Sequence, residues 1–158
     1  MRYNEAMRQY ADIVVYDKNG QLALIAEVKN KQGTSKEWAA KLRRNMYAHN
    51  FMPNAPFFLL ALPDRFYLWK TPTNTGEEIE PTHQIDPTSF LQPYFEKAGV
   101  SPGTVTGKSF ELIVGSWLNQ ILRASNPEDI QNHGQDWLLD SGLFEALAGG
   151  HLEFETAA

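Results

Sequence analysis

The dipeptide Asn19-Gly20 constrains the fold of this chain most strongly, because it lies between two apolar segments that have the composition of β-strands. Asn-Gly favours the tight turns of β-hairpins, since these turns need positive φ angles at their central residues. We therefore predict two antiparallel strands, over residues 11–16 and 21–29, that form a hairpin.

The hairpin register decides which side chains meet. In a two-residue loop Lys18 pairs with Gln21, and counting back along both strands places Asp12 directly opposite Glu27. Directly opposed side chains share a sheet face, with Cβ atoms about 4.5–5.5 Å apart. Lys29 follows Glu27 by two residues and so points to the same face. A three-residue loop would separate Asp12 from Glu27 and remove this arrangement.

Two carboxylates held together in an apolar sheet repel each other and lose solvation, so we expect a cation to neutralise them. Mg²⁺ is commonly held by a few carboxylate oxygens and water. Lys29 beside such a site can orient a metal-bound water or stabilise charge on a phosphate. An Asp followed by Glu-x-Lys on the neighbouring strand therefore indicates metal-assisted hydrolysis of phosphodiesters.

These residues resemble the PD-(D/E)xK nuclease superfamily, whose fold is restriction-endonuclease-like. The surrounding sequence, ADIVVYDKNGQLALIAEVKNK, is similar to nuclease-type domains of restriction and defence proteins, and the resemblance covers residues 10–70. It implies that Asp12 and Glu27 bind Mg²⁺ or Mn²⁺ together with the backbone carbonyl of Val28. It also implies that Lys29 positions the attacking water.

The chain departs from the family pattern at two points. Ala11 stands where the family usually has a proline, which is a common variation. Only eleven residues precede Asp12, whereas these domains normally open with a helix ahead of the first core strand. We therefore expect a nuclease-like core over residues 1–70, for which either the chain is a fragment or the fold is abbreviated ahead of the first strand.

The segment after the hairpin predicts a crossover. Residues 35–50 have an apolar stripe at helical spacing, and residues 56–62 and 66–70 read as two further strands. A strand–helix–strand crossover makes residues 21–29 and 56–62 parallel neighbours. The predicted fold class is thus α/β, a restriction-endonuclease-like mixed sheet with a helical second half. The residues that we expect in the sheet–helix core are Ile13, Val15, Leu24, Leu59, Leu60, Trp38 and Leu42.

The second half has a different composition. Residues 71–86 are rich in Thr, Pro and Glu and predict a linker or loop, and residues 87–158 predict an acidic helical extension that packs on the core or on a partner. We expect helices over residues 87–97, 107–124 and 135–147, the last interrupted or re-aimed at Gly142, and a closing strand at residues 151–155. The buried residues predicted for this half are Phe110, Trp117, Trp137 and Phe144.

Charge is distributed unevenly. Residues 1–70 hold 11 lysines and arginines against 6 acidic residues, whereas residues 71–158 hold 3 against 13. The half with the candidate site is therefore the basic half, as phosphate binding requires. The residues that we expect to bind nucleic acid are Lys31, Lys36, Lys41, Arg43 and Arg44. For each of them taken alone, an ordinary solvated helix face is the alternative.

The chain has no cysteine, no signal-peptide pattern and no apolar run long enough to span a bilayer. These features predict a cytoplasmic protein without a membrane partner. The main hypothesis is a divalent-metal-dependent nuclease that acts on nucleic acid, with DNA favoured, in restriction, defence or DNA processing. One alternative is a non-catalytic module that binds nucleic acid or protein, including a second copy in a homodimer. Another is that Glu27 and Lys29 form an ordinary ion pair near a sheet edge.

Overall fold

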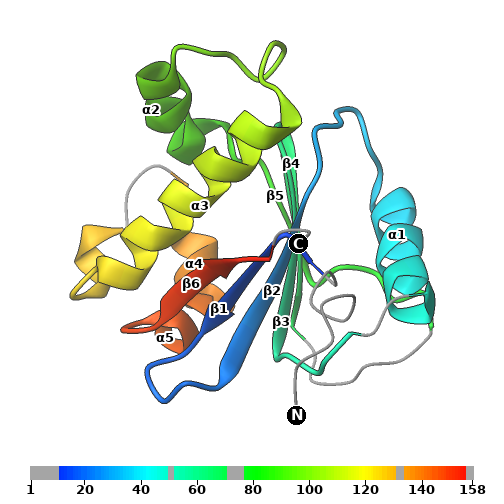
Figure 1. Ribbon diagram of the computed structural model, residues 1–158, viewed down its shortest axis with the longest axis horizontal. Coiled ribbons are helices and arrows are strands. Elements are labelled where there is room, and N and C mark those ends of the chain that lie inside the picture. The colour runs from blue at the N-terminus through cyan, green and yellow to red at the C-terminus, as the bar shows by residue number, and fades with distance from the viewer. Residues whose placement is uncertain (1–10, 50–51, 71–76, 131–133, 156–158) are drawn as a thin grey trace.

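A six-stranded mixed sheet lies between two layers of helices in this computed structural model, which describes residues 11–49, 52–70, 77–130 and 134–155. The strands are β1 (Ile13–Tyr16), β2 (Leu22–Val28), β3 (Phe57–Leu62), β4 (Arg65–Lys70), β5 (His83–Ile85) and β6 (His151–Phe154). The helices are α1 (Lys36–His49), α2 (Thr88–Ala98), α3 (Gly107–Arg123), α4 (Asp136–Asp140) and α5 (Leu143–Leu147). Helix α1 covers one face of the sheet, and α2 to α5 cover the other (Figure 1).

The strand order is β5-β4-β3-β2-β1-β6. β2 and β3 are parallel neighbours joined by the α1 crossover, and the other neighbouring pairs are antiparallel. This confirms the predicted hairpin, crossover helix and two further strands, and it confirms the α/β class. β6 confirms the predicted closing strand, because it pairs with β1 at the edge of the sheet.

β5 lies in the range that the sequence predicted to be a linker or loop. Thr82 explains the difference, since its backbone N–H and its hydroxyl both donate to the Leu68 carbonyl at 2.8 Å. These two bonds align the following residues with β4, where Ile85 pairs with Phe66.

The hairpin loop differs from the prediction. The Asp17 N–H donates to the Gln21 carbonyl at 2.7 Å, so the loop contains three residues and not two. One Asp17 carboxylate oxygen accepts from the backbone N–H groups of Asn19 and Gln21, each at 2.9 Å. Gly20 has φ 81°, the left-handed conformation that closes a three-residue loop. The preference of the Asp17 side chain for its own turn thus overrides the two-residue turn that Asn-Gly favours.

A bulge in β2 compensates for the longer loop. Tyr16 pairs with Leu22 but Val15 pairs with Leu24, so Ala23 is an extra residue on that strand. Beyond the bulge Ile13 pairs with Ala26, and the next pair along the ladder is Asp12 with Glu27. The predicted register at the site is therefore confirmed, although the predicted loop length was wrong.

Most of the predicted core is confirmed. The five strand residues predicted to be buried are completely buried. The four aromatic residues predicted to be buried in the helical half are at most 8 % exposed. Trp38 and Leu42 are only half-buried, which corrects their prediction. Helix α1 instead turns Ala39, Ala40 and Met46 toward the sheet, because two small alanines allow close approach.

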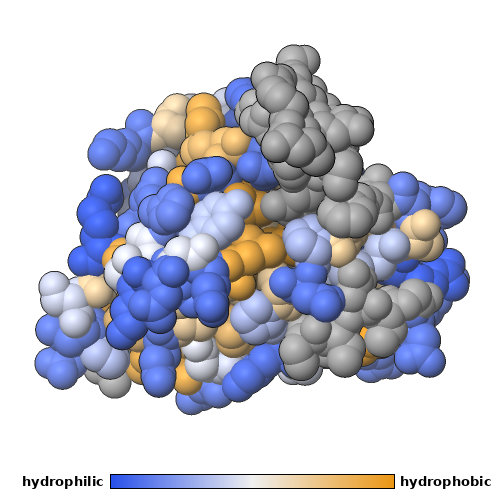
Figure 2. Space-filling view, turned by 60° about the horizontal axis from the view of Figure 1, so that its bottom comes forward, coloured by the Kyte–Doolittle hydropathy of each residue, from blue (hydrophilic) through white to orange (hydrophobic). Residues whose placement is uncertain are grey.

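The helices of the second half begin and end close to the predicted positions. Thr106 caps α3 by accepting a hydrogen bond from the Ser109 N–H at 3.1 Å. Gly142, with φ 85°, separates α4 from α5 where the sequence predicted an interruption. In the described parts of the chain, we find no helix whose length and apolar character would let it cross a membrane. Figure 2 shows a largely hydrophilic face with hydrophobic surface gathered near its middle.

Candidate active site

Asp12, Glu27 and Lys29 come together where β1 begins and β2 ends. The Asp12 and Glu27 carboxyl groups lie within hydrogen-bonding reach of each other. Lys29 Nζ is 3.3 Å from Glu27 Oε2. The register and the alternation of side chains along the strands place all three on the sheet face that α1 covers. The structure thus assembles the three residues that the sequence selected.

Glu27 is a perturbed carboxyl group. Its side chain is 13 % exposed, and burial together with the neighbouring Asp12 raises its pKa to about 7, although Lys29 acts in the opposite direction. Because an isolated buried carboxylate is costly, Glu27 exchanges its proton near neutral pH. A site of this kind favours either a proton or a cation between its two carboxyl groups.

Asp12 is held from two sides. Its Oδ2 accepts a hydrogen bond from the Val28 N–H at 2.8 Å, and its backbone carbonyl accepts one from the Glu155 N–H at 2.9 Å. On the other side of β2, the Lys29 N–H donates to the Ala61 carbonyl at 3.1 Å. Backbone groups of β2, of β3 and of the residue that follows β6 therefore fix the positions of Asp12 and of the end of β2.

A further acidic residue, Glu111 on α3, approaches this site. Burial and the charge of Asp12 both raise the pKa of Glu111, and its carboxylate lies 3.7 Å from Lys108 Nζ. The start of α3 is tied to the end of β2, because the Asn30 side chain donates to the Val105 carbonyl at 2.7 Å. Sequence reasoning missed Glu111, since no local pattern indicates that α3 packs on β2 and β6.

The donor set of the site fits a hard divalent cation. Asp12 and Glu27 supply carboxylate oxygens from neighbouring strands, and oxygen donors suit Mg²⁺ and Mn²⁺. Burial, and then the charge of Asp12, raises the pKa of Glu27, and a cation between the two carboxylates would offset both effects. No group of three Asp, Glu, His or Cys side chains is close enough to form a complete cage within the described residues. The candidate ligands are therefore the two carboxylates, with the Val28 carbonyl predicted as a third.

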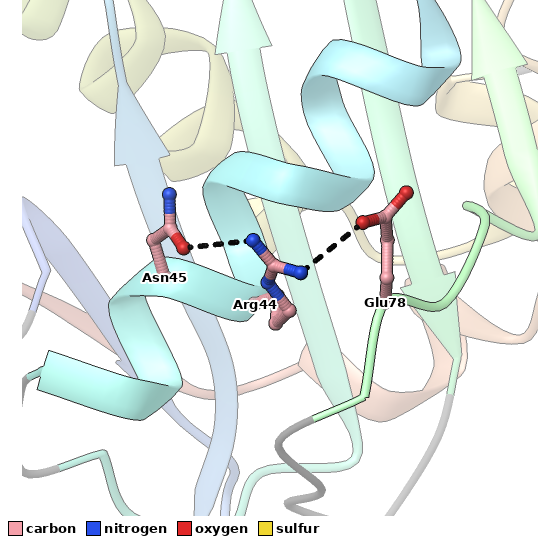
Figure 3. Close-up of polar contacts among 3 residues, drawn as sticks. All are labelled: Arg44, Asn45 and Glu78. Carbon is pink, nitrogen blue, oxygen red and sulfur yellow. Dashed lines mark hydrogen bonds and ion pairs between the residues drawn. The ribbon is translucent and has the colours of Figure 1, made fainter.

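Two of the predicted nucleic-acid-binding residues are paired with acidic residues of the chain itself. Lys36 Nζ lies 3.4 Å from Glu80 and Arg44 Nη1 lies 3.4 Å from Glu78. Figure 3 shows the guanidinium of Arg44 between Glu78 and Asn45. The acidic segment before β5 thus neutralises part of the basic surface of α1.

Lys31 and Lys41 are exposed, as the prediction requires. The Lys31 ammonium lies 5.8 Å from the centre of the Trp38 ring, which keeps this cation near the start of α1. Their accessibility leaves both residues free to meet a phosphate.

Arg43 does not lie on the exposed face of α1, which corrects its predicted placement. Its side chain is 1 % exposed, and its guanidinium lies 4.5 Å from the Tyr47 ring centre, 5.6 Å from that of Trp69 and 5.7 Å from that of Phe58. Burial lowers the pKa of Arg43. The position follows from helical spacing, since Arg43 comes one turn after Ala39 on the buried stripe. A residue buried in this way does not fit the expected contact with nucleic acid.

Comparisons of this chain with protein-family models, with curated proteins and with solved structures found no match. The function is therefore inferred from the carboxylate pair, Lys29 and their surroundings.

Proposed function

We propose that this protein is a divalent-metal-dependent nuclease of the PD-(D/E)xK type, with a restriction-endonuclease-like fold, that hydrolyses phosphodiester bonds in DNA. The observation that carries the proposal is the partly buried pair of Asp12 and Glu27, with Lys29 Nζ 3.3 Å from the Glu27 carboxylate. The fold assignment is supported by a hairpin that is followed by a crossover helix and a parallel strand.

Each residue has a distinct role in this proposal. Asp12 and Glu27 would hold Mg²⁺ or Mn²⁺ together with the Val28 carbonyl. The bound cation would supply a water of lowered pKa and stabilise charge on the phosphate. Lys29, whose side chain is 43 % exposed, would orient that water from the solvent side of the pair. Exposed Lys31 is the nearest candidate in sequence for contact with a substrate phosphate.

The test of this proposal is cleavage of single- and double-stranded DNA and RNA with Mg²⁺ or Mn²⁺. We expect Asp12→Ala and Glu27→Ala to lose both metal binding and cleavage. Lys29→Ala should keep or raise metal affinity, because a nearby positive charge is removed, while its cleavage rate falls about 10²–10⁴-fold. Lys18→Ala is the matched control, since Lys18 is an exposed lysine of the hairpin loop. Cleavage that survives Asp12→Ala would rule out this site.

Metal binding should also depend on pH. Because the pKa of Glu27 is about 7, binding of a cation must displace the Glu27 proton below that pH. We expect Mn²⁺ affinity, measured by calorimetry, to rise roughly tenfold between pH 6 and pH 8. Calorimetry at pH 6.5 in buffers of different ionisation enthalpy should show proton release, which should disappear at pH 8.5, where Glu27 is already ionised. A Mn²⁺ affinity that does not change between pH 6 and pH 8 would contradict the raised pKa of Glu27.

The second candidate is a non-catalytic module that binds nucleic acid or protein. The pairing of Lys36 with Glu80 and of Arg44 with Glu78 favours it, because a nuclease would be expected to leave more of this basic surface open. Such a module would bind a nucleic acid or partner but would show no cleavage with any divalent cation. Binding without cleavage, measured on the same substrates, therefore separates the two functions.

A further inference from the structure

A groove of about 600 Å³ lies between α2 and α3, in the layer of helices on the other side of the sheet from α1. It is lined by residues 94, 97 and 98 of α2 and by a stripe of α3 that runs from Ser109 to Arg123. A volume of this size is typical of small-molecule sites, which span about 300–1,000 Å³.

The groove is cationic within an acidic half of the chain. Residues 71–158 contain 3 basic residues against 13 acidic ones, and two of the three, Lys97 and Arg123, line this groove. No acidic residue is found among the described residues that line it. Neither cation has a carboxylate within 4.0 Å in the described parts of the chain. Lys97 and Arg123 thus place two unpaired cations in one groove of a half-chain that contains only three basic residues.

The remaining lining is apolar or neutral. Leu112 is 51 % exposed, which is unusual for a large aliphatic side chain, and Ile113 and Ala98 continue the apolar wall. The Tyr94 hydroxyl donates to the side-chain oxygen of Gln120 and joins the two helices across the groove. A smaller hollow of about 290 Å³ adjoins it and shares Tyr94, Lys97 and Gln120 with it.

We propose that this groove binds a small organic anion with an apolar body. Lys97 and Arg123 pair with the anionic head, and Leu112 and Ile113 contact the body. The site is separate from the carboxylate pair, because Asp12 and Glu27 lie on the sheet face that α1 covers, whereas α2 and α3 lie on the opposite face. The proposal therefore holds whether or not the nuclease activity is found.

The first test uses two fluorescent probes that share an aromatic body. 1-Anilinonaphthalene-8-sulfonate carries a negative charge, and N-phenyl-1-naphthylamine does not. We expect the sulfonate to bind the folded protein with one-to-one stoichiometry and to bind more weakly as salt is raised, because the pairing is electrostatic and partly exposed. Sulfonate binding that is no tighter than that of the neutral probe would overturn the proposal.

Variants locate the binding. Lys97→Met and Arg123→Met should each weaken sulfonate binding roughly two- to tenfold, while binding of the neutral probe stays unchanged. Lys108→Met is the matched control, because Lys108 is the third basic residue of this half and does not line the groove. Leu112→Ser should weaken binding of both probes. An equal effect of Lys108→Met, or no effect of the two groove variants, would overturn the assignment.

Competition identifies the anionic head. Decanoate, decyl phosphate and decanol share one alkyl chain and differ only in the head. We expect decanoate or decyl phosphate to displace the sulfonate, and decanol to displace it much less. The better competitor shows whether the groove prefers a carboxylate or a phosphate. Failure of both anions, or equal displacement by decanol, would contradict an anion site.

Discussion

Glu27 ties the stability of the protein to pH. Its pKa is raised from 4.5 in the unfolded chain to about 7 in the folded protein, so its favourable contribution is complete below pH 4.5 and is lost as the pH rises through 7. Glu27→Gln keeps a neutral group of the same shape. We expect the variant to match the wild type near pH 5 and to be more stable by roughly 1–3 kcal/mol at pH 8, measured by urea unfolding without metal.

A matched change of charge separates this effect from net charge. Glu145 is exposed on α5, so Glu145→Gln should leave the pH dependence of unfolding unchanged. Addition of Mg²⁺ at pH 8 should stabilise the wild type but not Glu27→Gln. A stability difference between Glu27→Gln and the wild type that stays constant from pH 5 to pH 8 would mean that Glu27 does not titrate in this range.

Arg43 offers a second prediction about a buried charge. Its Nε and Nη1 atoms have no hydrogen-bond partner in the described structure, so the three aromatic rings and the contact with the Tyr47 side chain compensate only part of its desolvation. Arg43→Met fills a similar volume without a charge, and we expect it to be neutral or stabilising by up to about 4 kcal/mol. Arg43→Lys should destabilise, since an ammonium group cannot stack on the Tyr47 ring as a planar guanidinium can. Thermal unfolding measures both, and a large loss in Arg43→Met would show that the charge itself stabilises the fold.

The sequence predicted the positions of three residues of the candidate site correctly, misplaced Arg43 and missed Glu111. Asp12, Glu27 and Lys29 could be selected because strand alternation and a single turn relate them. Arg43 could not, because its charge suggested exposure while its helical position determined burial. Glu111 could not either, since its approach to Asp12 depends on how a distant helix packs.

At the scale of elements, the β1–β2 hairpin has two irregularities that cancel. The three-residue loop shifts the ladder by one residue, and the bulge at Ala23 shifts it back. The prediction from the turn alone paired Asp12 with Glu27 correctly, although it assumed a two-residue loop. Local turn chemistry therefore predicted the existence of the hairpin, but the register also depended on burying Leu24 and Ala26 on one face.

The contact of α3 with β6 depends on a glycine. A Cβ placed on Gly115 would lie 2.5 Å from the Phe154 ring, so the ring occupies the space of the missing side chain. Gly115→Ala should gain about 1 kcal/mol of helix propensity when Phe154 is also Ala, and gain less or lose stability when Phe154 is present. A double-mutant cycle by urea unfolding should give a coupling of at least about 0.5 kcal/mol. Additive effects would mean that the ring moves aside freely.

At the scale of the whole molecule, β6 closes the sheet by pairing with β1. The chain reaches this position at Gly150, where a Cβ would lie 2.0 Å from the Tyr16 carbonyl oxygen. That neighbour is backbone and cannot rotate away. We therefore expect Gly150→Ala to cost roughly 1–3 kcal/mol and to lower hydrogen-exchange protection in β1.

Gly103→Ala is the control for this change, because the nearest atom to its Cβ would lie 4.0 Å away. It should change stability by less than about 0.5 kcal/mol. Unchanged protection of β1 in Gly150→Ala would show that β6 tolerates a shifted start.

The overall architecture could be predicted where local patterns sufficed. The α/β class, the parallel β2–β3 pair and the breaks between helices followed from periodicity, crossover length and glycine positions. β5 was missed because its three residues have no strand pattern and are aligned by the bonds of Thr82 to β4. Pairing between distant segments therefore limited the prediction more than the recognition of single elements did.

The bond between the Glu155 N–H and the Asp12 carbonyl joins residues that are synthesised at very different times. A ribosome adds roughly 5–20 residues per second, so a nascent chain would expose Asp12 and Glu27 for several seconds before residues 151–155 exist. During that interval β1 lacks its neighbour β6, and Asp12 lacks the hydrogen bond from the Glu155 N–H. Until translation has passed residue 155, the β1–β2 hairpin and the Val28 N–H would hold Asp12 beside Glu27 without this second anchor.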